Sequence, residues 1–281
     1  MSNQSLENKL VTIITPVHNG SYTLQRTINS IRRQKYEEIE YIVVDGGSTD
    51  GTREIIKKNE DIIDYWTSEP DKGPYDAMNK GIKVATGDLI GILNSDDLFL
   101  DHTLETVVSK YKGTKDLCII YGNLVKFGKG GHEILFEGDM TQEAFRKCSI
   151  QLNHPTCFVP KRIYDKYGLF DTSFETGADR ELMYRMHREG VEFVKVDKVL
   201  AKFRLGGLTS NFDIRKSFRV LVDSFRMHKR HNLPYEYFIP HVLRGFIGNM
   251  TKSLVKKTFG ENLLSKTRSY WLSNKFKEYR K

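Results

Sequence analysis

Two adjacent carboxylates, Asp96 and Asp97, follow an apolar stretch in the segment GILNSDDLFLD. Like charges this close together raise each other's cost of ionisation. In one interpretation they form a polar turn at the end of a strand. In the other they hold a divalent cation bound to a diphosphate, because Mg²⁺ and Mn²⁺ prefer carboxylate and phosphate oxygens as ligands. The motif alone leaves both interpretations open.

A third carboxylate, Asp45, ends the apolar run YIVVD and is followed by Gly46 and Gly47. A carboxylate there can accept a hydrogen bond from a nucleobase N–H, and the glycines permit a tight turn and the close approach of a ligand. The alternative is a strand-to-helix turn in which Asp50 or Thr52 caps the next helix.

The segment EPDKGPYDAMNKG, residues 69–81, is dense in polar residues and glycine. Asp71, Lys72 and Gly73 are expected to form a loop before a helix. Asp76 and Asn79 then lie on the first turns of that helix, near its positive end. A plain linker does not need this density of polar groups, so the segment favours a binding site.

Short apolar runs and helical spacings of apolar residues alternate along the first half of the chain. The predicted strands are Leu10–Ile14, Tyr41–Val44, Ile62–Thr67, Leu89–Leu93, Leu117–Tyr121 and Val191–Val196. The predicted helices are Tyr22–Gln34, Thr52–Lys58, Tyr75–Ala85, Thr103–Tyr111, Asp179–Glu189 and Lys216–His231. This alternation predicts a mostly parallel sheet covered by helices, with ligands beyond the carboxyl ends of the strands. Thr15, Asp45, Asp71, Asp96 and Asp97 all fall at those ends.

Several classes of protein are disfavoured by what the sequence lacks. There is no GxGxxG after the first strand and no GxxxxGK[ST], which disfavours a dinucleotide dehydrogenase and a P-loop enzyme. The three cysteines have no CxxC spacing, so a zinc site or a disulfide framework is not expected. The amino-terminal residues do not resemble a signal peptide, and no apolar run is long enough to span a membrane. We therefore expect a cytoplasmic protein.

The basic excess is confined to the carboxyl-terminal part of the chain. Residues 215–281 hold 16 lysines and arginines against 4 acidic residues, whereas the first 214 residues carry a net charge of −4. We expect a catalytic domain over 1–214, with halves 1–121 and 122–214, and a basic helical tail over 215–281. Phe246, Met250 and Leu254 have helical spacing among lysines, which favours contact with an anionic membrane surface. The alternative is packing on the domain. No nucleic acid partner is expected, since no known module accompanies the charge.

Seven short motifs in register resemble the family 2 glycosyltransferases of GT-A fold, and specifically the bacterial enzymes that build surface polysaccharides. They are TIITPVHNG, IVVDGGSTDGT, SEPDKGPYDAMNKGI, LNSDD, HPTCFVPKRIYDKYGLFD, ADRELMYRM and FRLGGLTS. The resemblance covers about Val11 to Ser210. It implies a Rossmann-like, mostly parallel α/β sheet with helices on both faces, followed by the basic tail.

The resemblance also implies a role for individual residues. Asp96 and Asp97 correspond to the region that binds ribose and the metal–diphosphate, with Mn²⁺ or Mg²⁺ as cofactor, and Asp179 to the catalytic base. The full set implied for the nucleotide-sugar is Thr15, Pro16, Val17, Asp45, Asp71, Gly73, Asn79, Asn94, Asp96 and Asp97. Asn94 stands where the acidic motif usually begins with Asp, and Ala178 stands where Glu often precedes the base.

Three residues of the second half keep a second interpretation. Asp179 also fits a helix N-cap. His154 is either a contact to the acceptor or a phosphate, or a packed histidine. Arg204, before two glycines, either pairs with phosphate through its planar fork or lies at the surface.

Together these features predict an inverting, metal-dependent enzyme that moves one sugar from a UDP-sugar to a lipid-linked saccharide acceptor. The product would be bacterial O-antigen, capsule or exopolysaccharide, made at the inner face of the cell membrane by a peripheral protein. The QxxRW motif of processive synthases is absent. Two alternatives remain: a sugar nucleotidyltransferase, whose basic glycine-rich loop is not found in TPVHNGSYTL, and a non-catalytic membrane-associated carbohydrate-binding protein, which would not need its acidic residues.

Overall fold

The computed structural model describes residues 10–114, 118–127, 133–205, 214–236 and 239–240, with no side-chain description for residues 214–217. The chain divides into two compact units, Met1–Leu208 and Thr209–Lys281. Each unit is described by itself.

The first unit is built on a twisted mixed sheet, which contains nine strands among the residues described. Its amino-terminal half is parallel, in the order β3-β2-β1-β4. These strands are β1 (Val11–Val17), β2 (Ile39–Asp45), β3 (Tyr65–Ser68) and β4 (Leu89–Ile92). Every residue of β1 and β4 is buried, as expected of parallel strands covered on both faces. The predicted strand–helix alternation and fold class are confirmed.

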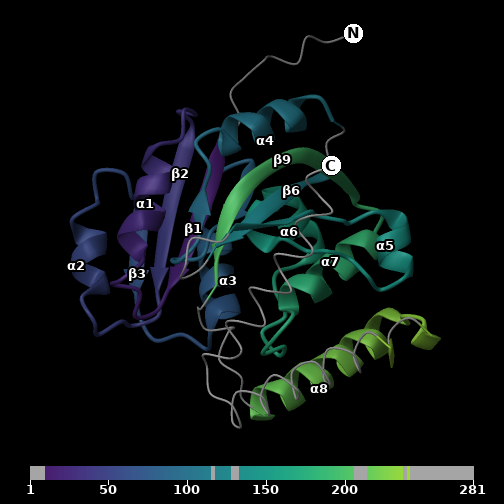
Figure 1. Cartoon of the computed structure of the whole chain (residues 1–281). Coiled ribbons are helices and arrows are strands. Elements are labelled where there is room, and N and C mark those ends of the chain that lie inside the picture. Colours follow the sequence, from purple (N-terminus) through teal and green to yellow (C-terminus); the bar gives the residue numbers. More distant parts are fainter. Residues whose placement is uncertain (1–9, 115–117, 128–132, 206–213, 237–238, 241–281) are drawn as a thin grey trace. The chain divides into compact units, whose positions relative to one another are not determined.

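The second half of the sheet continues in the order β8-β6-β9-β5, with β7 paired to β6. Its strands are β5 (Leu98–Phe99), β6 (Cys118–Phe127), β7 (Glu133–Phe136), β8 (Phe158–Pro160) and β9 (Glu192–Arg204). All its strand pairings are antiparallel except that of β6 with β9. Figure 1 shows β9 arching across the sheet. Both β6 and β9 are longer than their apolar runs indicated, because their distal ends are only half-buried.

Helices cover both faces of the sheet (Figure 1). They are α1 (Leu24–Arg32), α2 (Thr52–Lys57), α3 (Pro74–Val84), α4 (Thr103–Lys112), α5 (Gln142–Arg146), α6 (Lys161–Tyr167) and α7 (Ala178–Arg188). The short α5 and α6, like β5 and β7, were not predicted from the sequence.

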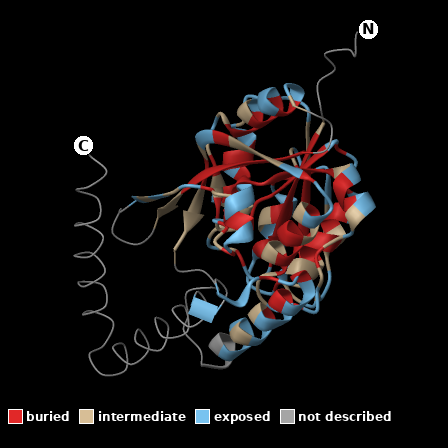
Figure 2. Cartoon of the chain, turned by 90° about the vertical axis from the view of Figure 1, so that its right-hand side faces the viewer, coloured by how far each residue is buried: buried red, intermediate tan, exposed pale blue. Residues whose placement is uncertain are grey.

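Alternate residues of β1 face opposite helices, because side chains of a strand alternate between the two faces. Ile13 lies in one buried cluster with residues of α1, α2 and α4. Ile14 faces α3 on the other side, where Gly81 brings the helix so close that a Cβ would lie 2.5 Å from the Ile14 side chain. Figure 2 shows the resulting buried centre of the sheet in red.

The second unit contains α8 (Ile214–His231) among its described residues, in agreement with the helix predicted at Lys216–His231. The part of the proposed tail that holds Phe246, Met250 and Leu254 lies outside the described residues. Within those that are described, no helix combines the length and apolar character needed to cross a membrane.

Candidate active site

The loops that follow β1, β2 and β3 meet at the carboxyl edge of the parallel strands. The Asn19 N–H donates to the Ser48 hydroxyl at 2.7 Å, and the Gly20 N–H donates to the Thr52 hydroxyl at 2.9 Å. The loop after β2 also touches the loop before α3, since a Cβ on Gly46 would lie 2.5 Å from a carboxylate oxygen of Asp71. Glycine at position 46 therefore lets these two loops close on each other.

Asp71 caps its own loop. Its Oδ1 accepts the Gly73 N–H at 2.8 Å, immediately before α3 begins. Gly73 has φ +116, a conformation that L residues rarely adopt. The structure thus brings Asp71 and Gly73 to the same edge as Asp45, as predicted from the order of the strands.

Asp45 is fully buried and fully hydrogen-bonded. It accepts the hydroxyl and the N–H of Ser48, and the Ser68 hydroxyl at 2.6 Å. Thr15 is likewise buried and accepts the Tyr41 hydroxyl at 3.2 Å. Because Asp45 is fully buried and bonded by both serines, direct contact with a nucleobase would require neighbouring side chains to move.

Asp97 is, like Asp45, a fully buried acidic group at this edge, with a relative exposure of 0%. Its Oδ1 accepts the backbone N–H of Arg204 at 3.0 Å, and its Oδ2 accepts the Asn94 side-chain amide at 3.1 Å. Its backbone carbonyl accepts the Thr27 hydroxyl of α1 at 2.8 Å. One residue therefore joins the turn after β4, the end of β9 and α1.

Asp96 differs from its neighbour because its side chain is partly exposed. Burial raises the pKa of Asp97 to about 7, and the carboxylate of Asp96 adds to that rise. Burial also raises the pKa of Asp96, against the attraction of Arg204. The Arg204 guanidinium itself lies 5.1 Å from the centre of the Tyr22 ring, within cation–π range. This edge therefore favours a ligand that brings positive charge.

The oxygen atoms available at this turn are suitable ligands for a divalent cation that also binds a diphosphate. Among the residues described, no three acidic, histidine or cysteine side chains gather as a complete metal site. Asp96 offers an accessible carboxylate and Asn94 an amide oxygen. Mg²⁺ typically takes one or two protein carboxylates and completes its shell with water and substrate phosphates. Of the two predicted carboxylate ligands, Asp96 is the accessible one.

Asp179 lies at the first turn of α7, after Gly177 with φ +78. The Tyr75 hydroxyl of α3 donates to Asp179 Oδ1 at 3.2 Å and accepts the Gly177 N–H at 3.2 Å. Burial lowers the pKa of His154, and the negative charge of Asp179 partly offsets this effect. The ring of Tyr75, whose hydroxyl holds Asp179, and the ring of His154 both contact Phe170, with ring centres 5.6 and 5.7 Å from it, so the predicted base and His154 lie on the same side of the fold.

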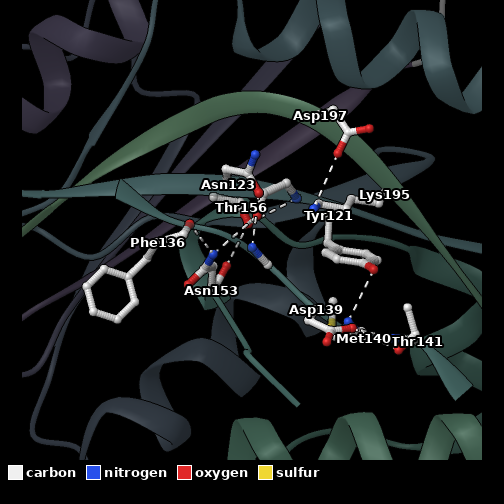
Figure 3. A network of polar contacts seen from close by, with 12 residues as sticks. Tyr121, Asn123, Phe136, Asp139, Met140, Thr141, Asn153, Thr156, Lys195 and Asp197 are labelled. Atoms are coloured by element: carbon white, nitrogen blue, oxygen red, sulfur yellow. Dashed lines mark hydrogen bonds and ion pairs between the residues drawn. The ribbon is translucent and has the colours of Figure 1, made fainter. Parts of the chain in front are cut away.

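A polar network fixes the turn that carries His154, residues His154–Thr156. The Thr156 hydroxyl donates to the Gly122 carbonyl at 3.0 Å, and the Asn153 amide donates to the Phe136 carbonyl at 3.1 Å. Figure 3 shows Asn153 and Thr156 beside Asn123, where β6 shifts its register against β9. Gly122, at the irregularity in β6, therefore helps to fix the turn that begins at His154.

Asn79 has a different partner from the one expected of a nucleotide-sugar residue. Its side-chain amide donates to the Phe170 carbonyl at 2.8 Å and accepts the Phe170 N–H at 3.0 Å. It is buried, so α3 uses it to hold the chain before α7. Tyr75, by contrast, was not singled out from the sequence. Its only signal was its place inside the polar segment GPYDAMNKG.

Comparison with known proteins identifies the family. The description "Glycosyl transferase family 2" matches residues 12–169. The chain belongs to this family. It is 31% identical over 223 residues to an uncharacterized glycosyltransferase of Mycobacterium tuberculosis, covering 79% of this chain and 85% of that one. Over 119 residues it is 33% identical to the Escherichia coli UDP-Glc:alpha-D-GlcNAc-diphosphoundecaprenol beta-1,3-glucosyltransferase WfgD, covering 42% and 47% of the two chains.

Solved structures of glycosyltransferases share the fold. S. aureus TarS 1-349 in complex with UDP-GlcNAc has a TM-score of 0.60 at 17% identity, over 85% of this chain and 72% of that chain. The mannosyltransferase PcManGT from Pyrobaculum calidifontis, in complex with GDP-Man and Mn²⁺, has a TM-score of 0.62 at 17% identity, over 98% and 84%. The predicted family, GT-A fold and glycosyltransferase activity are confirmed, which sets aside the nucleotidyltransferase and non-catalytic alternatives.

The burial of Asp97 predicts a loss of stability that Asp96 does not share. Replacing Asp97 by Ala leaves the Arg204 N–H and the Asn94 amide without their acceptor, which costs about 1–3 kcal/mol. Asp96→Ala should change the unfolding free energy by less than about 0.5 kcal/mol, as is usual near a surface. Urea unfolding of both variants without metal measures the difference. Equal stabilities would contradict the structural role of Asp97.

Proposed function

We propose that this glycosyltransferase is an inverting, metal-dependent enzyme that transfers one sugar from a UDP-sugar to a hydroxyl of a lipid-linked saccharide. The observation that carries the proposal is the placement of Asp179. Its carboxylate is held by the hydroxyl of Tyr75, which lies in the first turn of α3, directly after the Asp71–Gly73 loop. A carboxylate tied to the donor-side helix is suited to act on an acceptor beside the donor.

The donor side of the proposal rests on the loops at the carboxyl edge. Thr15, Pro16 and Val17 end β1, and Asp45 ends β2 beside the Asp71 loop. We assign the uracil and ribose to this edge and the diphosphate to the turn of Asn94 and Asp96. Arg204, attracted to Asp96, would face the same phosphates. Both TarS with UDP-GlcNAc and PcManGT with GDP-Man are nucleotide-sugar complexes of this fold.

Asp96, with Asn94, would hold a divalent cation, Mn²⁺ or Mg²⁺. When bound, such an ion neutralises the charge that grows on the leaving diphosphate. Mn²⁺ accompanies GDP-Man in the PcManGT structure, which supports a divalent ion without deciding which one.

On the acceptor side, Asp179 takes the proton from the attacking hydroxyl as general base. The oxygen then bonds to the anomeric carbon from the face opposite the leaving UDP, so the configuration inverts. His154, positioned near Asp179, would contact the acceptor or its phosphate. The acceptor named in WfgD is a diphosphoundecaprenol-linked sugar, which supports a lipid-linked acceptor here. We place the reaction in bacterial O-antigen, capsule or exopolysaccharide synthesis.

If the acceptor is bound to a membrane, α8 can help to attach the enzyme to that membrane. Phe218, Val222 and Phe225 share one face of this helix at helical spacing, and each is more than 40% exposed. Lys229 falls on the same face, and Arg226 lies beside it. A face that combines apolar and basic side chains suits the anionic inner surface of a cell membrane. We therefore propose a peripheral enzyme at the cytoplasmic face, in which α8 contributes to attachment together with the basic tail.

We expect Asp179→Asn to fold and to bind UDP with Mn²⁺ normally, but to lose turnover by about 10²-fold or more, as for loss of a general base. The donor is first chosen by thermal shift among UDP-Gal, UDP-Glc, UDP-GlcNAc, UDP-GalNAc and UDP-GlcA with Mn²⁺, because a true donor stabilises the fold. UDP release with a lipid-diphosphate-GlcNAc acceptor then measures turnover. The control is Asp165→Asn on the exposed side of α6. A variant that kept most of its rate would place the base elsewhere.

Asp96→Ala should lose the Mn²⁺-dependent part of UDP binding by about 10-fold or more, since removing even an indirect partner of a metal ligand typically costs 10–100-fold. Isothermal calorimetry with UDP measures the affinity with Mn²⁺ and with a chelator. The affinity in chelator should stay unchanged, and Asp101→Ala, five residues along the chain, should behave as the parent. An unchanged Mn²⁺ effect in Asp96→Ala would argue against this ligand.

The pair of substitutions Phe218→Ser and Phe225→Ser should weaken binding to vesicles of phosphatidylglycerol and phosphatidylcholine by about tenfold or more, given the transfer energy of partly buried aromatic side chains. High salt should weaken binding further by screening the basic residues. Co-sedimentation measures both effects. Leu135→Ser, which changes an exposed apolar residue of the first unit, is the control. Equal sedimentation of parent and double variant would remove α8 from the membrane contact.

A further inference from the structure

We propose that Tyr75 is a positioning residue that ties the donor-binding segment to the catalytic base and leaves one oxygen of Asp179 free for the acceptor. The inference rests on the proposed role of Asp179 as the base. It concerns a residue to which the sequence motifs assigned no function.

The contacts of Tyr75 connect two parts of the chain that are about a hundred residues apart. Tyr75 lies on the first turn of α3, two residues after Gly73. Its hydroxyl donates to Asp179 Oδ1 at 3.2 Å and accepts the Gly177 N–H at 3.2 Å. Both ends of this bridge are local turns: the Asp71 loop precedes Tyr75, and the left-handed Gly177 starts α7. The hydroxyl therefore sets the distance between the two turns.

The two oxygens of Asp179 are used differently. Oδ1 accepts the Tyr75 hydroxyl and the backbone N–H of Arg180, the latter at 2.9 Å. Among the residues that the structure describes, Oδ2 accepts no hydrogen bond. A general base needs a lone pair within hydrogen-bond reach of the proton that it removes. Fixing Oδ1 with two donors orients the carboxylate so that Oδ2 is the oxygen available to the acceptor hydroxyl.

The ring of Tyr75 is held as firmly as its hydroxyl. It stacks on Phe170, with ring centres 5.6 Å apart. Phe170 is in turn fixed by both backbone hydrogen bonds to Asn79, one turn further along α3. His154 contacts the same Phe170 ring edge-on at 5.7 Å. One helix thus supplies the hydroxyl, the support of the ring and the link to His154.

Tyr75 stays a hydrogen-bond donor at physiological pH. Burial raises the pKa of its hydroxyl above the ordinary value, and the charge of Asp179 raises it further. The same hydroxyl cannot act as the base itself under these conditions, so its contribution passes through Asp179.

The test is Tyr75→Phe, which keeps the ring and its stacking on Phe170 and removes only the hydroxyl. With the UDP-sugar selected above and the lipid-diphosphate-GlcNAc acceptor, kcat should fall by about tenfold, within the range by which mispositioning a catalytic group slows a reaction. The KM for the UDP-sugar and the calorimetric affinity for UDP with Mn²⁺ should stay within about twofold of the parent. The matched control is Tyr164→Phe, whose ring lies 6.3 Å from the same Phe170.

A double variant separates positioning from a general structural effect. If Tyr75 acts through Asp179, Tyr75→Phe should slow the Asp179→Asn enzyme no further, because residues that act as a unit are not additive. Additive losses, an unchanged kcat, or loss of UDP–Mn²⁺ binding in Tyr75→Phe would each overturn the inference. A fully active Asp179→Asn enzyme would instead overturn the proposed base. The two failures are therefore distinguishable.

Discussion

The rest of the site depends on the hydrogen bonds that the buried carboxylate of Asp97 accepts. Moving a carboxylate out of water is costly unless its oxygens find donors. Here the donors come from distant parts of the chain, the Arg204 N–H at the end of β9 and the Asn94 amide after β4. The need to satisfy this one group holds the turn after the central strand β4 against the end of β9. It also leaves Asp96, the preceding residue, at the accessible side of the turn.

Other acidic residues of the carboxyl edge also use their oxygens for hydrogen bonds within the protein. Asp45 accepts hydrogen bonds from Ser48 and Ser68, and Asp71 accepts one from the Gly73 N–H. These contacts shape the loops before any ligand arrives. Because parallel strands end at one edge, short loops are sufficient to bring separate segments of the chain together there, where we propose that the nucleotide-sugar binds.

Helix α3 joins the half of the domain to which we assign the donor to the half to which we assign the acceptor. Its amino-terminal turn carries Tyr75 to Asp179, and its middle carries Asn79 to Phe170. Gly81 lets the helix sit directly on β1 at Ile14. A helix fixed to the central strand and to both halves transmits position rigidly, which matters for transfer between two substrates, since small displacements of reacting groups slow a reaction strongly.

The sequence by itself determined the fold class, the first four strands with their helices, and the order of the motifs that identify the family. Buried parallel strands and amphipathic helices leave a strong local pattern, since burial repeats along each element. The short β5, β7, α5 and α6 were missed, because so few residues carry no readable period. The set of residues at the carboxyl edge was also predictable, since strand ends follow from strand positions.

Only the tertiary structure decided what each polar residue does there. It showed that Asp97 is buried and hydrogen-bonded whereas Asp96 is accessible. It also gave Asn79 a backbone partner at Phe170 and brought Tyr75 to Asp179. Each of these contacts joins residues far apart in sequence or depends on which side of a turn faces the interior. Periodicity reports how deeply a position is buried and not which group it meets, so the partners of a polar side chain emerge only when distant segments pack together.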